Sequence, residues 1–187
     1  MLHLGCGLDS RPLRLAPPPS CRWLDVDQPE VMDVRRRLYD FPAHVRQVPG
    51  SVTAESWWRE VDPDRATLVV AEGLFMYIRP AAVHALVDRI VSGTRRAELA
   101  FDAVSAWSAT ASRWAPTFRA LGTSFHWAWH PADFARRHRT LRELDDIAVI
   151  DEMTVRDPRV WLRPFLSAAG HLPVVQDALR VHRFTTR

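Results

Sequence analysis

Short apolar runs alternate with segments of helical periodicity along most of the chain. Continuous apolar runs are typical of parallel strands that are buried on both faces. The alternation of such strands with helices favours an α/β fold with a doubly wound, mostly parallel sheet. The pattern predicts strands at residues 2–4, 21–27, 45–48, 67–72 and 98–102, and helices between them at 29–39, 55–58 and 80–91.

The last third of the chain adds two more strands and two more helices to this prediction. Periodicity predicts helices at 131–137 and 159–169, and the second ends at Gly170 because glycine commonly terminates helices. Strands are predicted at residues 140–147 and 178–184. Apolar and polar side chains alternate along the second of these segments, which is typical of a strand. With 187 residues in all, we expect one domain over residues 1–187.

The first apolar run leads directly into the turn Gly5-Cys6-Gly7. Glycine is used where the backbone needs a positive φ or must come close to another group. A strand that ends in a glycine-rich turn, at the edge of an α/β sheet, is a common place for nucleotide-like ligands. A lone Gly-x-Gly also occurs in ordinary tight turns, so this motif needs support from the residues that follow.

The second predicted strand supplies that support, because it ends in acid at Asp25 and Asp27. A carboxylate at the tip of this strand accepts hydrogen bonds from ribose hydroxyls in dinucleotide-type folds, and Asp27 is the one at the tip. Asp27 could also cap the helix that begins at Pro29, and both roles can hold through different atoms. Ser10 stands where a nicotinamide site has the third glycine of Gly-x-Gly-x-x-Gly, which counts against NAD.

Three segments together resemble the signatures of one family: residues 4–11, residues 25–31 with Arg35-Arg36-Arg37, and residues 71–78. In order and spacing they resemble the leucine carboxyl methyltransferase and polyketide O-methyltransferase family, which uses S-adenosylmethionine. The resemblance extends over about residues 2 to 105, with 101–105 as the next strand. It implies a Rossmann-like, class I methyltransferase fold with a seven-stranded sheet in the order 3-2-1-4-5-7-6.

The resemblance also implies a function and a site. It implies a cytoplasmic enzyme that transfers a methyl group from S-adenosylmethionine to a carboxylate or hydroxyl oxygen of a small molecule, such as a polyketide or another secondary metabolite. Asp27 would hold the ribose, Ser51 and Val52 would flank the adenine, and Glu72 would face the amino-acid portion of the cofactor; the alternative for Glu72 is a solvated strand end. The implied cofactor-binding residues are Gly5, Cys6, Gly7, Arg11, Asp27, Ser51, Val52, Glu72 and Gly73.

Two alternatives to an active methyltransferase stay open. A nicotinamide oxidoreductase shares the Gly-x-Gly turn and the acid, although the missing third glycine and the segment around Glu72 argue against it. A non-catalytic or truncated remnant is the other, because the family has a helical N-terminal segment with basic cofactor contacts, whereas Met1 already falls in the first strand. A start assigned too late, a fragment or a real loss would each explain this. We expect weak cofactor binding and self-association into homo-oligomers from an uncovered sheet face.

Residues 106–138 are rich in aromatic side chains and are expected to form a lid or the acceptor pocket. The same aromatics would equally suit the core of an inserted helical lid. His126 and His130 have the spacing of a metal pair on a helix, but Pro131 breaks such a helix and no third ligand is near, so no metal is expected. Either histidine could act as a general base, and the sequence identifies no catalytic residue.

Charge and composition narrow the range of partners. Lys and Arg number 25 against 22 for Asp and Glu, and the small excess is spread along the chain, so no nucleic-acid partner is expected. No apolar run is long enough to predict a membrane span.

The helix at 29–39 places Val31, Val34 and Leu38 on one apolar face, and Arg35-Arg36-Arg37 are interpreted as a solvated face. Cys6 and Cys21 fall on strands expected to be neighbours and are predicted to be reduced packing residues.

Overall fold

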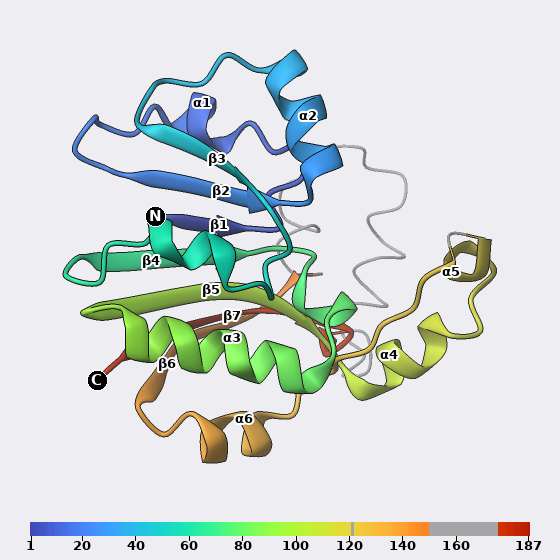
Figure 1. The fold of residues 1–187 in the computed structure, drawn as a ribbon. Coiled ribbons are helices and arrows are strands. Elements are labelled where there is room, and N and C mark those ends of the chain that lie inside the picture. Colours follow the sequence, from blue (N-terminus) through green and yellow to red (C-terminus); the bar gives the residue numbers. More distant parts are fainter. Residues whose placement is uncertain (121, 150–175) are drawn as a thin grey trace, which may run out of the picture.

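The structure is a computed structural model that describes residues 1–120, 122–149 and 176–187. Its centre is a seven-stranded sheet in the order β3-β2-β1-β4-β5-β7-β6, which confirms the predicted order. Helices α1 and α2 lie on one face of the sheet, and α3 and α6 lie on the other (Figure 1). The strands are β1 (Leu2–Leu4), β2 (Trp23–Asp27), β3 (Val45–Pro49), β4 (Ala66–Ala71), β5 (Arg96–Val104), β6 (Leu141–Ala148) and β7 (Leu179–Thr186).

The helices follow the predicted alternation closely. Several of them have proline in the first turn, where its missing N–H is no loss, among them α2 (Pro29–Leu38) and α3 (Pro80–Gly93). The others are α1 (Arg11–Leu15), α4 (Ala106–Ser112), α5 (Pro116–Ala120) and α6 (Pro131–Arg137), with short 3-10 helices η1 (Ser56–Glu60) and η2 (Phe75–Tyr77). The predicted helix at 159–169 and Gly170 lie outside the described residues.

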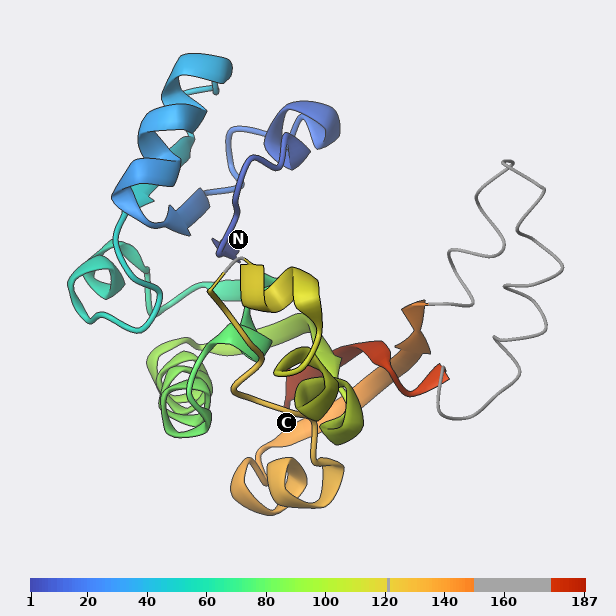
Figure 2. The ribbon, with the colours of Figure 1, turned by 90° about the vertical axis from the view of Figure 1, so that its right-hand side faces the viewer.

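Strand register sets up the functional edge of the sheet. β1 pairs in parallel with β2 and β4, and Leu4 lies opposite Val26 on one side and Ala71 on the other. The residues that follow these three positions therefore leave the sheet together at its carboxyl edge. β7 runs antiparallel to both β5 and β6, as expected for the two late strands. Figure 2 looks at the carboxyl edge and shows α4 and α5 crossing in front of it.

The apolar core lies on the face of the central strands that α3 covers. Leu4, Val26, Ala71 and Phe101 from the sheet are almost completely buried, and they share one apolar cluster with Val83 of α3. Burying apolar area stabilises the fold by roughly 25 cal/mol per Å². Trp57 of η1 belongs to the same cluster. The rigid core therefore fixes the ends of β1, β2, β4 and β5, where the candidate site lies.

The prediction of which side of α2 is buried was wrong. Val34 and Leu38, on the predicted apolar face, are 41% and 57% exposed. Met32 and Arg35 are the buried residues of this helix, and Arg35 is 0% exposed. The physical reason is a buried partner, because the Arg35 guanidinium is paired with the carboxylate of Asp25 on β2.

Three local features complete the description of the fold. Residues 11–15 form the short helix α1, and Ala16 takes a left-handed conformation (φ +44°) that ends it. His126 and His130 lie in an extended segment without helix, so they lack the helical spacing of a metal pair. Cys6 follows β1 and Cys21 precedes β2, so the two lie at opposite edges of the sheet, and both are free thiols.

Among the described residues, no helix is both long enough and apolar enough to cross a membrane.

Candidate active site

Three strand ends are tied together by hydrogen bonds at the carboxyl edge. The Gly5 N–H donates to the Val26 carbonyl (2.8 Å), and the Gly50 N–H donates to the Asp27 carbonyl (2.8 Å). The Gly7 N–H donates to Oδ2 of Asp27 (2.7 Å). These bonds join the loops after β1, β2 and β3 into one unit, and the loop after β4 lies beside them through the pairing of β1 with β4.

The glycines in these loops differ in what surrounds them. Gly5, Gly7 and Gly73 all have left-handed backbones, with φ of +62°, +52° and +61°. A Cβ at Gly5 would lie 2.8 Å from Cδ1 of Leu74, so Gly5 is glycine because the next loop packs on it. A Cβ at Gly7 or Gly73 would meet nothing within 4 Å. Gly7 and Gly73 therefore border open space into which a ligand could bring its polar atoms close to the backbone.

We expect alanine at Gly5 and at Gly7 to have different effects. Each substitution should cost about 1–2 kcal/mol of stability from the left-handed backbone. Gly5→Ala should lose about 1–3 kcal/mol more, because its methyl group overpacks against Leu74. Urea unfolding of both variants measures the difference, and Leu74→Ala in the Gly5→Ala background should recover part of the loss. Equal losses for the two glycines would contradict the packing argument.

Asp27 lies at the tip of β2 and uses its carboxylate to hold two backbone groups. Oδ2 accepts from the Gly7 N–H, and Oδ1 accepts from the Gln28 N–H at 2.7 Å. The alternative role as the cap of α2 is not found, since Gln28 is the capping position and no side chain caps there. Each carboxylate oxygen has a second lone pair, so Asp27 can still accept hydrogen bonds from a ligand.

Asp25 belongs to a buried network beneath the glycine turn. Its Oδ1 accepts from the Trp23 indole N–H (2.7 Å) and lies 3.2 Å from Nδ1 of His3. Its Oδ2 accepts from the Arg35 guanidinium at 2.5 Å, and both side chains are fully buried. Asp25 is therefore enclosed by three side chains inside the protein, whereas Asp27 faces the edge.

Arg35 connects this network to the turn above it. Its Nη1 donates to the carbonyls of Gly7 (2.9 Å) and Asp9 (2.7 Å), and its guanidinium carbon lies 4.9 Å from the centre of the Phe41 ring. The Tyr39 hydroxyl donates to the Leu8 carbonyl between them (2.7 Å). Sequence reasoning missed Arg35; the signal was Asp25, a carboxylate in a buried strand that needs a cation nearby.

Glu72 follows β4 and is 65% exposed, beside the start of α1. The Arg11 guanidinium forms ion pairs with Glu72 and with Asp9, the latter with 3.0 Å between Nε and Oδ2. Burial acts to raise the pKa of Asp9, but the backbone N–H and the charge of Arg11 outweigh it and hold that pKa below its usual value. Asp9, Arg11 and Glu72 thus form a charged bridge between the loops after β1 and β4.

Asp102 on β5 holds the backbone of the loop after β4. Its Oδ1 accepts from the Gly73 N–H at 2.7 Å. Burial raises the pKa of Asp102, and the charge of Glu72 acts in the same direction, while the Gly73 N–H opposes them. Asp102 is therefore a buried anchor for Gly73.

Asp102→Asn tests this with the pH dependence of stability. Because the folded-state pKa is raised, the stability that Asp102 contributes is full below its unfolded-state pKa and is lost as the pH rises through the folded-state pKa. Asparagine keeps the acceptor for Gly73 and never ionises, so its stability relative to wild type should increase between pH 4 and pH 7. Urea unfolding at both pH values measures this difference in stability, with the exposed substitution Asp33→Asn as the matched control. A difference that does not change with pH would refute the assignment.

Three other residues implied by the resemblance lie at this edge with their side chains engaged in the protein. The Ser51 hydroxyl lies 2.9 Å from that of Thr53, within the loop after β3. The Val52 side chain is buried in the core, and its carbonyl accepts from the Trp57 indole N–H at 3.1 Å. Burial raises the pKa of Cys6, with the charge of Asp25 acting the same way, so its thiol stays neutral. Contacts from Cys6 and Val52 to a ligand would therefore come from backbone atoms.

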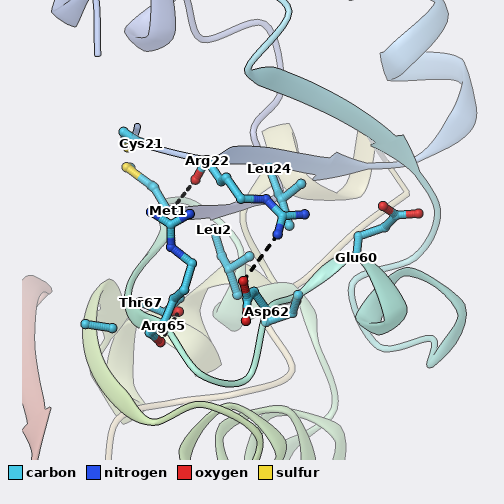
Figure 3. A pocket seen from close by; sticks show the side chains of 11 residues that line it. Met1, Leu2, Cys21, Arg22, Leu24, Glu60, Asp62, Arg65 and Thr67 are labelled. Carbon is cyan, nitrogen blue, oxygen red and sulfur yellow. Dashed lines mark hydrogen bonds and ion pairs between the residues drawn. The ribbon is translucent and has the colours of Figure 1, made fainter. Parts of the chain in front are cut away.

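Two other groups of residues lie away from this edge. A small cavity of about 110 Å³ lies at the amino edge, where the Met1 ammonium donates to the Arg22 carbonyl (2.6 Å) and Arg22 pairs with Asp62 (Figure 3).

The other group consists of three possible metal ligands that lie within 4.8 Å of one another: Glu143, Asp146 and His182. Arg180 already pairs with Asp146 there at 2.6 Å, so a cation would have to displace a guanidinium.

Comparison with known proteins places this architecture. The sequence pattern of the family described as Leucine carboxyl methyltransferase matches residues 1–91, which include the loops after β1, β2, β3 and β4. The tetracenomycin polyketide synthesis O-methyltransferase TcmP of Streptomyces glaucescens is 33% identical over 186 residues, covering 99% of this chain and 69% of TcmP. The chain belongs to the leucine carboxyl methyltransferase family. A further relative is the S-adenosyl-L-methionine-dependent methyltransferase dpfgK of Gibberella zeae, 34% identical over 140 residues, covering 68% of this chain and 47% of dpfgK.

Solved structures agree on the fold of this family member. A putative methyltransferase from Thermobifida fusca superposes with a TM-score of 0.69 at 15% identity, covering all of this chain and 72% of the other. The mitomycin 7-O-methyltransferase MmcR superposes with a TM-score of 0.58, also at 15% identity, covering all of this chain and 48% of MmcR. At such identities the likeness establishes the class I methyltransferase fold alone.

Proposed function

We propose that this chain binds S-adenosylmethionine at the carboxyl edge of β1, β2 and β4 and transfers its methyl group to a carboxylate or hydroxyl oxygen of a small molecule. The observation that supports this most is the pair of left-handed glycines: Gly7, which is bonded to Asp27, and Gly73, which follows Glu72, each border open space. Membership in the leucine carboxyl methyltransferase family and the O-methyltransferase activity named for TcmP point to the same chemistry.

The residues present fit S-adenosylmethionine in charge and in space. Asp27 has free lone pairs beside the Gly7 backbone and would accept from the ribose hydroxyls. Glu72, held by Arg11, would accept from the ammonium of the amino-acid portion. Ser51 and Val52 would flank the adenine, largely through backbone atoms. Gly5 supports this site indirectly, because it allows Leu74 to pack between the two loops.

The chemistry asks this chain mainly for positioning. When bound, S-adenosylmethionine supplies a methyl group on a strongly electrophilic sulfonium. The loops would hold the cofactor still while the acceptor oxygen is kept in line with the methyl, and such orientation accounts for much of the rate in reactions of this kind. A carboxylate acceptor needs no base, whereas a hydroxyl acceptor would have to lose its proton.

The acceptor side is proposed for residues 106–138, the segment that crosses the carboxyl edge. Aromatic rings cluster at this edge: the Phe125 ring centre lies 4.8 Å from that of Phe118 and 5.3 Å from that of Tyr77. Tyr77 is partly exposed in the loop that follows Gly73. Such a surface suits a flat, unsaturated acceptor, in keeping with the polyketide named for TcmP.

Thermal unfolding with two ligands tests the proposal. S-adenosylhomocysteine at 100 times its Kd should stabilise the chain by about 2.7 kcal/mol, and NAD at the same concentration should not. The expectation follows from the two carboxylates and from Ser10 at the position of the third glycine of a nicotinamide site. A melting shift with NAD and none with S-adenosylhomocysteine would overturn the proposal.

A further inference from the structure

A second cavity, of about 300 Å³, lies on the α3 side of the sheet. It is bounded by the first turns of α3, by α4, by residues 125–130 and by α6, elements that Figure 1 places below and beside the sheet. None of the residues proposed for the cofactor lines it. Its size is at the lower end of the range for small-molecule sites.

A chain of hydrogen bonds leads from the surface to this cavity. Oδ1 of Asp88 lies 3.0 Å from Nδ1 of His138, and Nε2 of His138 lies 2.9 Å from Nδ1 of His84. His138 is buried, while His84 is half-buried and lines the cavity. Burial lowers the pKa of both imidazoles, so both are neutral near pH 7. Arg137 and Asp133 are the other charged groups that act on this pair, and Arg137 also pairs with Asp88 (3.4 Å).

The chain fixes which nitrogen of His84 is free. A carboxylate only accepts, so Nδ1 of His138 carries the proton and its Nε2 is an acceptor. The proton between the two rings must then sit on Nδ1 of His84. Nε2 of His84 is left as an unprotonated acceptor, suited to a hydroxyl group in the cavity.

The rest of the lining is aromatic, polar and basic. Phe125, Trp127 and Phe134 provide ring surfaces, and Arg113, which directly follows α4, lines the cavity as well. The remaining polar side chains of the lining are those of Thr110, His126 and His130. The carboxylate of Asp133, also in the lining, is paired with Arg136 at 2.6 Å and so is largely neutralised. The cavity therefore combines flat apolar walls, a positive charge and a hydrogen-bond acceptor.

We propose that this cavity is a binding site for a small aromatic acid that carries a hydroxyl group, with the ring against the aromatic walls, the carboxylate toward Arg113 and the hydroxyl donating to Nε2 of His84. Asp88 and His138 are positioning residues that keep His84 in the accepting tautomer. The site shares none of the proposed cofactor residues, but it is lined by residues of the segment 106–138 that is proposed for the acceptor. Binding of the probes below and the thermal shift with S-adenosylhomocysteine can therefore fail separately.

Three matched probes test the ligand chemistry by calorimetry on the whole chain. 4-Hydroxybenzoate has both polar groups, benzoate lacks the hydroxyl, and methyl 4-hydroxybenzoate lacks the charge. We expect 4-hydroxybenzoate to bind at least tenfold more tightly than either of the others. Arg113→Gln should remove the preference for the charged probe, and His84→Ala should remove the preference for the hydroxyl. Arg119→Gln, an exposed substitution on α5 outside the cavity, should change neither preference.

The tautomer of His84 can be measured directly, and it should not change if Asp88 and His138 only stabilise the fold. Imidazole nitrogen NMR should show the proton of His84 on Nδ1 in wild type and in His138→Gln, whose amide oxygen can replace the accepting nitrogen. His138→Leu should lose this preference and the selectivity for the hydroxyl together. The proposal would be overturned if none of the three probes binds to the folded wild type. It would also be overturned if His84→Ala and Arg113→Gln keep the selectivity of the wild type.

Discussion

Replacing Arg35 with methionine is expected to lower the free energy of unfolding by about 3–5 kcal/mol, the usual cost of removing one partner of a buried ion pair. Asp25 would be left as a buried carboxylate whose remaining partners are Trp23 and His3. The turn at 7–9 would also lose the two hydrogen bonds that its carbonyls accept from Arg35. Urea unfolding of the variant measures the loss, and a weaker affinity for S-adenosylhomocysteine should accompany it.

The neighbouring arginine on the same helix is a matched control. Arg36 is exposed and pairs with exposed Asp33 at 3.2 Å, so Arg36→Met should change stability by no more than about 0.5 kcal/mol. Combining Arg35→Met with Asp25→Asn should cost less than the sum of the two single changes, because the buried charge is gone as well. If Arg35→Met and Arg36→Met behave alike, the network does not support the turn as we infer.

Asp27→Ala is expected to weaken binding of S-adenosylhomocysteine by about 1.5–3 kcal/mol, or roughly 10- to 150-fold, the range for hydrogen bonds to a charged group. The carboxylate would no longer receive the ribose hydroxyls, and the Gly7 N–H would lose its acceptor. Calorimetry measures the affinity, with urea unfolding alongside to show that the chain remains folded.

Two other acids separate this role from general charge effects. Asp33→Ala, on the exposed side of α2, should leave the affinity unchanged. Asp25→Asn should act mainly on stability, because that carboxylate is enclosed by Arg35, His3 and Trp23. An affinity loss from Asp25→Asn as large as that from Asp27→Ala, in a folded variant, would mean that the wrong acid had been chosen.

The sequence was most informative where local pattern and topology coincide. Continuous apolar runs and the spacing of the motifs predicted the strand order, because parallel strands with crossover helices leave few arrangements. The same logic placed Gly5, Asp27 and Glu72 at one edge, since each directly follows or ends a paired strand. The helix at 131–137 was predicted with its observed bounds, helped by the proline at its start.

Features that depend on contacts between residues far apart in the sequence could not be predicted. The periodicity of α2 pointed to Val34 and Leu38 as its apolar face, and only contact with Asp25 explains why Arg35 is buried instead. Gly5 and Gly7 look alike in sequence, and they differ because Leu74, some seventy residues later, packs on one of them. Asp102 could be placed on its strand, but its bond to the Gly73 backbone depends on the exact turn after β4.

Hydrogen exchange in the presence of S-adenosylhomocysteine tests the central proposal, that the loops after β1, β2, β3 and β4 together hold the cofactor. Exchange should slow in peptides covering residues 5–9, 27–28, 50–53 and 72–74, whose backbone amides border the proposed site. Peptides covering 20–23 and 61–66, at the opposite edge, should be unchanged and serve as internal controls. Protection confined to the opposite edge, or no protection at saturating ligand, would contradict the proposal.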